Sequence, residues 1–385
     1  MKKVLFLIDT LEIGGAETSI LEIASRLKSW EPIVVYIYHG GTLKPRFESA
    51  GIKVYSLNVK AKFGIWKAYK ALSKIIHNEN PDIIHATLFK AELVSRFVGP
   101  KFNIPVINSF VNDSYSIERY ELLNFYQKNV LNLYKLVDRI TANRATQFMS
   151  ITNAIIHRNS SAIGINPEQV NVIYRGRDID AFRKKVDSNK LKGLREIYGN
   201  GPIILTVSRL LIRKGYLEAI RAIEKIIKSN PEVKYLIAGE GHDREHFQNL
   251  IRKLKLEENI FLLGNRNDIP TLLAFSDIFL FPSHYEGQGG ALVEAMILGK
   301  PIISSKIPVI EESVKDNFSA LLFEPKSIED ISAKILWAIS NQEKMKEYGE
   351  NAKNDAELRF DIEKVALQHE EMYDKVVMKM NKNNF

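Results

Sequence analysis

The sequence predicts an α/β protein made of two domains, each with a parallel sheet covered by helices. Its 385 residues exceed what one hydrophobic core usually serves. Short runs of β-branched residues alternate with stretches of helical periodicity, which is typical of parallel sheets. This alternation pauses at residues 174–202, a charged and glycine-containing segment that we interpret as a linker, and then resumes. We expect a ligand cleft between the domains.

The first half, residues 1–184, begins with a buried strand and an amphipathic helix. The strand is KVLFLID, and the helix AETSILEIASRL repeats apolar residues at Ile20, Ile23 and Leu27. Four further strands are predicted from their β-branched content: IVVYIY, VYSLNV, DIIHAT and VINSF. We expect these strands to form one parallel sheet.

The second half, residues 185–361, restarts the same rhythm. PIILTVSRL is a predicted strand, and GYLEAIRAIEKIIKSNP is a predicted amphipathic helix. The remaining predicted strands are VKYLIAGEG, ENIFLLG, DIFLFPS, PIISSK and ALLFEP. The last segment, residues 362–385, is predicted as a helix because Ile362, Val365, His369 and Tyr373 recur at three- to four-residue steps.

Composition and charge narrow the class of protein. The chain has no cysteine, which excludes disulfides and thiolate metal sites and fits a reducing compartment. Residues 1–185 hold 26 basic and 16 acidic residues, against 28 and 30 in the remainder. This imbalance favours an anionic partner for the first half, such as an anionic membrane surface or a lipid phosphate; a lysine-rich, solvated surface explains it equally well. No basic-aromatic motif indicates nucleic acid binding.

The start of the chain resembles a signal peptide only briefly. Two lysines precede an apolar run, but Asp9 interrupts it too early for a secretory signal. No apolar segment reaches the ~18 residues of a membrane-spanning helix. We therefore expect a cytoplasmic protein that is either soluble or peripheral on the inner face of the cell membrane.

Two loops that follow predicted strands suit an anion. In DTLEIGGAETSI, Gly14 and Gly15 lie between a strand and a helix, where backbone N–H groups can approach a phosphate. The pattern is not G-x-G-x-x-G, so an ordinary dinucleotide site is disfavoured. In SRLLIRKG, Arg209 and Lys214 can converge on one polyanion. A tight turn and a solvated basic loop are the simpler structural explanations of these two loops.

The stretch EGQGGALVEAM combines glycines with two acids. Gly287, Gly289 and Gly290 precede a predicted helix, and Glu286 and Glu294 stand eight positions apart. Carboxylates repel phosphate, but they accept hydrogen bonds from sugar hydroxyls. A nucleotide sugar reconciles these features, because its diphosphate needs cations and helix N–H groups while its two sugars offer hydroxyls.

These motifs together resemble the retaining glycosyltransferases of family 4. SRLLIRKG supplies the family's Arg-x4-Lys pair, and EGQGGALVEAMILGKPII supplies its Glu-x7-Glu spacing. AGEGHDREHF, FLLGNRNDIPTLLAFSDIFLFPS and the early IGGAE also match in order and spacing, so the resemblance covers nearly the whole chain. It implies the GT-B fold: two Rossmann-like domains, with the acceptor bound by residues 1–184, the donor by residues 185–361, and residues 362–385 crossing back to the first domain.

The resemblance also implies a reaction and roles for residues. The chain would transfer a hexose from a nucleotide-diphosphate sugar to a glycan or lipid-linked acceptor, in cell-surface polysaccharide or lipopolysaccharide synthesis, with retention and without metal or cofactor. Glu286 would hold the donor sugar, Glu294 the ribose, and Arg209 with Lys214 the leaving diphosphate. The implied donor-binding residues are Gly14, Gly15, Arg209, Lys214, Gly239, Asn265, Glu286, Gly287, Gly289, Gly290, Ala291, Leu292 and Glu294.

The first domain departs from the family pattern at its histidines. Many relatives have His-x-His after the corresponding strand, whereas this chain has His85 followed by Thr87. His85 is a candidate catalytic residue that contacts donor sugar or acceptor, or else a satisfied histidine at a strand end. Two other functions remain open: an epimerase or hydrolase of nucleotide sugars on the same fold, and a non-catalytic nucleotide-sugar binder.

Overall fold

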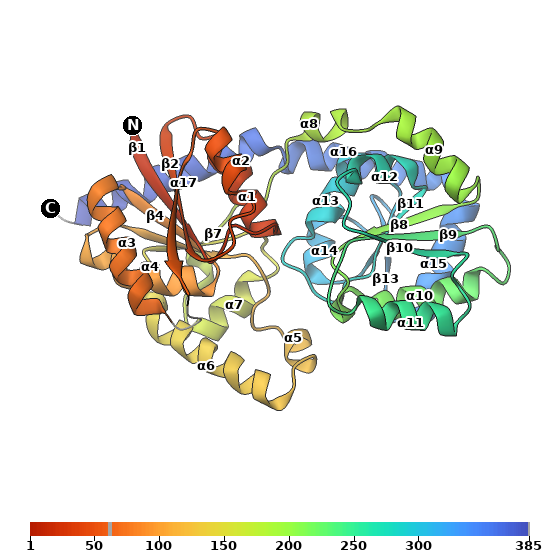
Figure 1. Ribbon diagram of the computed structural model, residues 1–385, viewed down its shortest axis with the longest axis horizontal. Coiled ribbons are helices and arrows are strands. Elements are labelled where there is room, and N and C mark those ends of the chain that lie inside the picture. The colour runs from red at the N-terminus through yellow and green to blue at the C-terminus, as the bar shows by residue number, and fades with distance from the viewer. Residues whose placement is uncertain (61–63, 384–385) are drawn as a thin grey trace. The chain divides into compact units, whose positions relative to one another are not determined.

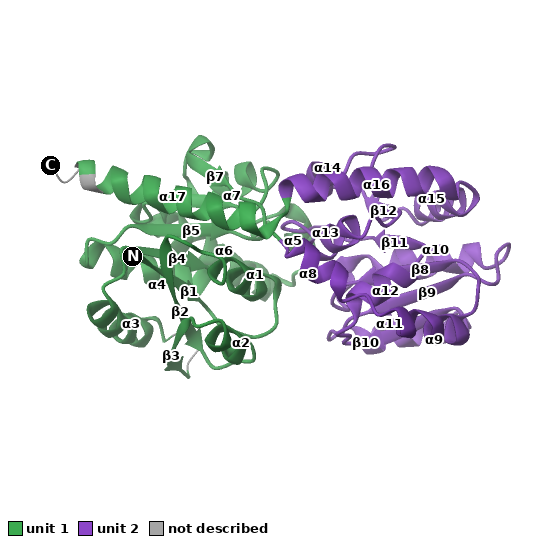
Figure 2. Ribbon diagram, turned by 90° about the horizontal axis from the view of Figure 1, so that it is seen from above, with its two compact units in different colours: residues 1–176, 360–385 green, residues 177–359 purple. Residues whose placement is uncertain are grey.

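The computed structural model describes residues 1–60 and 64–383. It divides into two compact units, coloured separately in Figure 2: unit 1 comprises residues 1–176 and 360–385, and unit 2 residues 177–359. The divisions fall eight and two residues before the expected boundaries at 184 and 361. The last two residues of the expected C-terminal segment lie outside the described part. Within the described residues, no helix combines the length and apolar character needed to cross a membrane.

Unit 1 contains a seven-stranded parallel sheet in the order β3-β2-β1-β4-β5-β6-β7. Its central strands are buried on both faces because helices cover both sides (Figure 1). The strands are β1 (Lys2–Ile8), β2 (Trp30–Tyr38), β3 (Lys53–Val59), β4 (Ile83–Thr87), β5 (Val106–Phe110), β6 (Gln147–Ser150) and β7 (Val170–Val172). The helices are α1 (Gly15–Ala24), α2 (Lys44–Ser49), α3 (Ile65–Glu79), α4 (Phe89–Lys101), α5 (Ile117–Glu121), α6 (Phe125–Thr141), α7 (Ile156–Ile163) and α17 (Ile362–Asn383), with short 3-10 turns η1 (Ala142–Arg144) and η2 (Pro167–Gln169).

Unit 2 contains a six-stranded parallel sheet in the order β10-β9-β8-β11-β12-β13. Its strands are β8 (Ile203–Val207), β9 (Lys234–Ala238), β10 (Ile260–Gly264), β11 (Ile278–Phe281), β12 (Ile302–Ser305) and β13 (Leu321–Phe323). Its helices are α8 (Ile179–Lys184), α9 (Ser188–Tyr198), α10 (Tyr216–Ile226), α11 (Arg244–Lys253), α12 (Ile269–Phe275), α13 (Gly290–Ile297), α14 (Pro308–Ser313), α15 (Ile328–Ser340) and α16 (Gln342–Arg359), with the 3-10 turn η3 (Ile212–Lys214).

The linker interpretation of residues 174–202 is wrong for most of that segment. It contains α8 and α9, and α9 packs against α12. Only Ile179 and Leu194 are buried in these two helices, so their apolar periodicity is too weak to stand out in the sequence. Two strands of unit 1, β6 and β7, with four and three residues, also lie outside the predicted set.

Helix α17 packs on the sheet of unit 1, although it follows unit 2 in the sequence (Figure 1). The Glu370 carboxylate accepts hydrogen bonds from the backbone N–H groups of Lys28 and Ser29, at 2.7 and 2.6 Å. Tyr373 is fully buried, and its ring lies edge-on to Trp30 with 5.4 Å between centroids. The core of unit 1 is therefore completed by the end of the chain.

Candidate functional site

In unit 2 the predicted cations and the first predicted acid meet where the strand order reverses. Strand β8 has β9 on one side and β11 on the other, so the loops after β8 and β11 diverge to opposite sides of the sheet. Open parallel sheets bind ligands at this point, beyond the carboxyl ends of the strands. Arg209 and Lys214 follow β8, and Glu286 follows β11.

Lys214 and Glu286 form a buried ion pair, with the ammonium Nζ donating to Glu286 Oε1. Their side chains are only 9% and 11% exposed. Burial lowers the pKa of Lys214, and this outweighs the opposite effect of Glu286. Burial raises the pKa of Glu286, but Lys214 and Arg213 more than offset it, so the net pKa is below its ordinary value. Glu286 is therefore ionised.

Two further cations of this loop, Arg209 and Arg213, act on Lys214. Arg209 is exposed and has no ion pair within the described part of the chain. Arg213 lies over the ring of Tyr285, 4.9 Å from its centroid, and donates to the Tyr285 carbonyl oxygen at 3.3 Å. Both arginines lower the pKa of Lys214 by repulsion. The loop thus carries an excess of positive charge, which suits an anion such as a diphosphate.

Glycines hold these loops together by close backbone approach. Gly215 has φ +72°, and a Cβ there would lie 2.0 Å from the carbonyl oxygen of Pro282 in the β11 loop. Gly239 has φ +146°, and a Cβ there would lie 2.0 Å from the carbonyl oxygen of Ser208. The contact explains why Gly239 is a glycine: it supports the loop that carries Arg209. Asn265 is exposed just after β10.

The glycines after Glu286 open helix α13, as the sequence predicts. Gly289 is the N-cap, with φ +83° and no side-chain cap. Its carbonyl oxygen accepts from the N–H of Leu292 at 2.9 Å, which leaves the N–H groups of Gly290 and Ala291 at the helix start. Such a terminus favours an anion. Gly287 lies in the same loop, between Glu286 and the N-cap.

Glu294 has a partner that the sequence did not indicate. The Nε of Arg177 donates to Glu294 Oε1 at 3.0 Å, and both side chains are largely buried. A Cβ on Gly290 would lie 2.7 Å from Nη2 of Arg177, so the guanidinium also lies against the start of α13. Arg177 falls in the segment interpreted as a linker, which is why sequence reasoning missed it.

The predicted glycine pair of unit 1 stands at the start of α1. Gly14 is the N-cap, in extended conformation and without a side-chain cap. A Cβ there would lie 2.3 Å from a carboxylate oxygen of Glu17, which folds back over the turn. A Cβ on Gly15 would lie 3.2 Å from Nη1 of Arg175. A second arginine of the supposed linker therefore lies beside a predicted anion site.

His85 is enclosed by protein groups. It is 4% exposed, its Nδ1 lies 2.8 Å from Tyr373 Oη, and its Nε2 lies 2.7 Å from Ser109 Oγ. Burial, and then His369, hold the pKa of His85 well below its ordinary value, so the ring is neutral. Nδ1 joins the sheet to α17 and Nε2 joins β4 to β5, so both ring nitrogens have protein partners, which favours a packing role over contact with a substrate.

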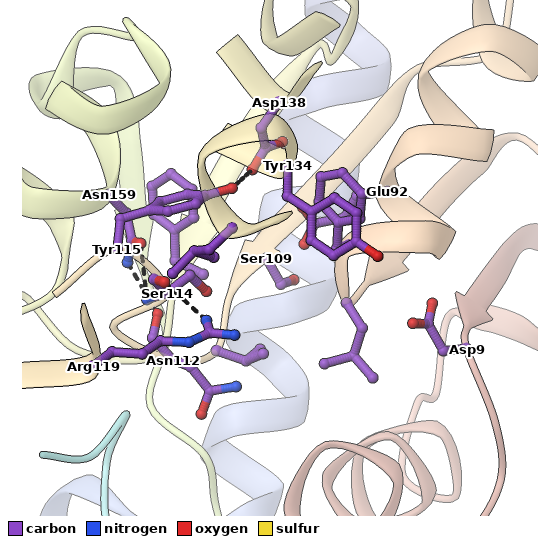
Figure 3. Close-up of a pocket in the computed structure, with 15 residues that line it drawn as sticks. Asp9, Glu92, Ser109, Asn112, Ser114, Tyr115, Arg119, Tyr134, Asp138 and Asn159 are labelled. Atoms are coloured by element: carbon purple, nitrogen blue, oxygen red, sulfur yellow. Dashed lines mark hydrogen bonds between the residues drawn. The ribbon is translucent and has the colours of Figure 1, made fainter. Parts of the chain in front are cut away.

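Unit 1 also contains a cavity that the sequence did not predict (Figure 3). It has a volume of about 280 Å³ and lies at the carboxyl ends of β1, β4 and β5. Asp9 follows β1, and Leu88 follows β4 with φ +79°, a backbone conformation that is costly for a branched residue. Arg119 and Tyr134 contribute from α5 and α6. Strand order reverses between β1 and β4, so this is the switch point of the first sheet.

The cavity wall rests on a buried polar network. Arg96, fully buried, donates to Asp138 Oδ1 at 2.5 Å and to Asn108 Oδ1 at 2.7 Å. The Tyr115 hydroxyl donates to Asp138 Oδ2 at 2.6 Å (Figure 3). Burial raises the pKa of Glu92 to about 8, despite the opposite effect of Arg96. Glu92 therefore holds its proton more readily than an ordinary glutamate.

Asp9 is the second acid in the cavity wall of unit 1 whose pKa is raised. Burial raises its pKa to about 6, although the N–H of Ala91 donates to its carboxylate at 2.9 Å. A pocket with acidic and hydroxyl groups and one arginine suits a ligand rich in hydroxyls. Within residues 1–60 and 64–383, no three side chains of His, Asp or Glu gather as metal ligands.

Comparisons with known proteins agree with this architecture. The family model described as Glycosyl transferases group 1 matches residues 187–355, and Glycosyltransferase Family 4 matches residues 13–181. HepE of Anabaena, solved in complex with UDP, is 25% identical, with a TM-score of 0.84 over 97% of this chain and 100% of that chain.

Curated relatives carry names of specific transferases. The UDP-Gal:alpha-D-GlcNAc-diphosphoundecaprenol alpha-1,3-galactosyltransferase of Escherichia coli is 26% identical over 81% of this chain and 80% of that protein. The N,N'-diacetylbacillosaminyl-diphospho-undecaprenol alpha-1,3-N-acetylgalactosaminyltransferase of Campylobacter jejuni is 24% identical over 93% of this chain and 95% of that protein. With both family models matched in order, the chain belongs to the family 4 glycosyltransferases and has the GT-B fold.

Proposed function

We propose that the protein is a retaining, metal-independent hexosyltransferase. It takes a sugar from a nucleotide-diphosphate donor held by unit 2. One observation carries this proposal: the buried pair of Lys214 and Glu286, with Arg209 and Arg213 beside it, at the switch point of the sheet. The cations bind the diphosphate, and Glu286 accepts hydrogen bonds from the donor sugar.

The proposed transfer depends on stabilising the negative charge that develops on the leaving nucleoside diphosphate. An acceptor hydroxyl oxygen attacks the anomeric carbon on the face from which the nucleoside diphosphate departs, so the configuration is retained. The bond from the anomeric carbon to the phosphate oxygen breaks, and the hydroxyl proton passes to a phosphate oxygen of the leaving group. Negative charge grows on that group, where Lys214, Arg209 and the start of α13 stabilise it in place of a metal ion. We assign the ribose to Glu294, whose carboxylate is held by Arg177, and the base to Asn265.

The acceptor is proposed to bind the cavity of unit 1 through a sugar bearing hydroxyls. The names of the E. coli and C. jejuni relatives state diphosphoundecaprenol-linked acceptors, and HepE was solved with UDP. These names support a UDP-sugar donor and a lipid-linked glycan acceptor. We propose that the reaction serves synthesis of a cell-surface polysaccharide such as lipopolysaccharide, at the inner face of the membrane. No cofactor is required.

A donor and acceptor screen tests the proposal. Purified protein with UDP-sugars and a lipid-linked glycan should release UDP and form a glycoside, and nuclear magnetic resonance should find the donor's anomeric configuration in the product. Chelators should leave the rate unchanged. Sugar release or epimerisation without an acceptor would support a hydrolase or epimerase instead. Donor binding without turnover, for every acceptor tried, would support a non-catalytic binder.

A further inference from the structure

Exposed apolar side chains concentrate on α5, α6 and the turn between them. Phe125 and Tyr126, at the start of α6, are 82% and 76% exposed, and Ile140, near its end, is 70% exposed. Large hydrophobic side chains are usually covered, and a contiguous exposed group marks an interaction surface. We call this surface the α6 outer face; its apolar members are Ile117, Leu122, Phe125, Tyr126, Leu133, Leu136 and Ile140.

Helix α6 is amphipathic in an inverted sense. Its buried side chains are few and mostly polar: Leu131, Asp138 and Thr141. An ordinary surface helix turns its apolar stripe toward the core. Here the apolar stripe points away from the core, because its five α6 members fall within about a third of the circumference, given about 3.6 residues per turn. Figure 1 shows α6 along the outer edge of unit 1.

Basic side chains flank this stripe. Lys128, Lys135 and Arg139 recur at steps of seven and four residues, so they share one side of the helix. Arg144 follows in the 3-10 turn after α6 and is exposed. Between residues 122 and 144 the single acid is Asp138, which is buried and paired with Arg96. Apart from the buried Asp138, all charged side chains of this segment are therefore cations.

We propose that the α6 outer face docks on an anionic lipid bilayer. Helices with an apolar face and flanking cations lie in the bilayer interface, where the apolar residues enter the acyl boundary and the cations meet anionic headgroups. Aromatic residues such as Phe125 and Tyr126 suit that depth. A second copy of the chain fits less well, because a two-fold contact would bring identical cationic flanks together.

The inner face of the same helix lines the cavity of unit 1. Leu131, Tyr134 and Asp138 contribute to its wall. A helix that rests on the membrane by one face and borders the acceptor pocket by the other holds that pocket at the headgroup layer. This part of the inference rests on the proposed function, because a lipid-linked acceptor presents its sugar there. Docking itself does not depend on turnover.

Vesicle co-sedimentation tests the docking. The probes are vesicles of phosphatidylcholine alone and of phosphatidylcholine with phosphatidylglycerol in equal parts. The intact chain should bind the mixed vesicles and release them as salt rises. The double variant Leu133→Gln/Leu136→Gln should lose affinity about tenfold or more, because two buried aliphatic contacts are removed. Its melting temperature should be unchanged, since both side chains are already exposed.

A matched control removes equally exposed aliphatic residues elsewhere. Ile197 and Leu358 of unit 2 are 71% and 70% exposed, and Ile197→Gln/Leu358→Gln should bind vesicles like the intact chain. Equal binding by both double variants, or no binding to mixed vesicles, would overturn the proposal. So would a concentration-dependent dimer that Leu133→Gln/Leu136→Gln abolishes, because the face would then be covered by a second copy. UDP release with a water-soluble acceptor, measured on the same samples, reports on the proposed function separately.

Discussion

Lys214 and Glu286 form one buried ion pair, in which the charge of each opposes the effect of burial on the other. Removing one partner of a buried pair leaves an uncompensated charge and costs about 3–5 kcal/mol, whereas replacing both by neutral groups is nearly neutral. We expect Lys214→Met to lower the melting temperature, and Lys214→Met/Glu286→Gln to restore it. Both variants should turn over about two to three orders of magnitude more slowly, because the charge that stabilises the leaving group is gone.

Arg209 offers a control for that experiment. It is exposed and unpaired within the described residues, so Arg209→Ala should reduce turnover while the melting temperature stays constant. Calorimetry and UDP release on the same preparations provide both readouts. If the double variant regained activity together with stability, Lys214 would be a structural residue and not a ligand of the diphosphate.

Asp9 makes a prediction about pH. Its pKa is about 6 in the folded chain and near 3.8 when unfolded, so the folded state binds more protons between these values. The raised pKa means that stability from this group is present below pH 3.8 and is lost as pH rises through 6. Asp9→Asn should therefore stabilise the chain by up to about 3 kcal/mol above pH about 7, with no gain below pH about 4.

Thermal melts of both proteins across this pH range measure the difference. Asparagine keeps an oxygen for the N–H of Ala91, so the local fold should persist. A gain that is constant with pH would mean that burial does not raise the pKa of Asp9. Because Asp9 lines the unit 1 cavity, the variant should also raise the KM for the acceptor.

At the level of residues, the sequence predicts the local groups and misses their distant partners. Glu286, Arg209 and Lys214 follow predicted strands, and parallel strands bring such residues to one edge of a sheet. Arg177 and Arg175 could not be predicted, because their positions beside Gly290 and Gly15 depend on where a charged segment runs. The raised pKa of Glu92 depends on burial, which single-sequence reasoning does not give.

At the level of elements, the sequence predicts the strands and helices whose apolar pattern is strong and misses those whose pattern is weak. The eleven predicted strands exist because each is a compact apolar run between turn signals. Helices α8 and α9 bury one side chain each, so their sequences look like a linker. Strands β6 and β7 are short and lie toward one edge of the sheet, where little apolar sequence is required.

Gly215 joins the elements of the unit 2 site and supports a third prediction. A side chain at Gly215 would be strained by the left-handed φ, and it would also clash with the Pro282 carbonyl oxygen. Gly215→Ala should destabilise the chain by about 2–4 kcal/mol and shift the loops after β8 and β11 apart, which reduces donor affinity. Chemical denaturation and calorimetric titration with UDP measure the two effects.

Gly193, within α9, is the matched control. A Cβ there meets nothing within 4 Å. Gly193→Ala should therefore stabilise the chain by about 0.5–1 kcal/mol, because alanine favours the helix. Equal effects of the two substitutions would show that the contact with Pro282 is easily relieved. Gly215 would then not be required for the geometry of the site.

At the level of the whole molecule, the chain builds unit 1 from both of its ends. The sequence predicts α17 as a helix, but its partners emerge only in three dimensions: Lys2 pairs with Asp374 at 2.8 Å, and His85 hydrogen-bonds to Tyr373. Unit 2, residues 177–359, is continuous in sequence. The two units should therefore differ in whether they fold from a single stretch of chain.

Fragments test this difference. Residues 177–359 should unfold cooperatively alone, because their sheet and helices come from one segment. Residues 1–176 should lack a cooperative transition, because Trp30 and His85, 1% and 4% exposed in the intact chain, lose the cover of α17. A peptide of residues 360–383 should restore the transition, and the Tyr373→Ala peptide should restore it poorly. Cooperative melting of residues 1–176 at one temperature with and without the peptide would contradict the dependence of unit 1 on the end of the chain.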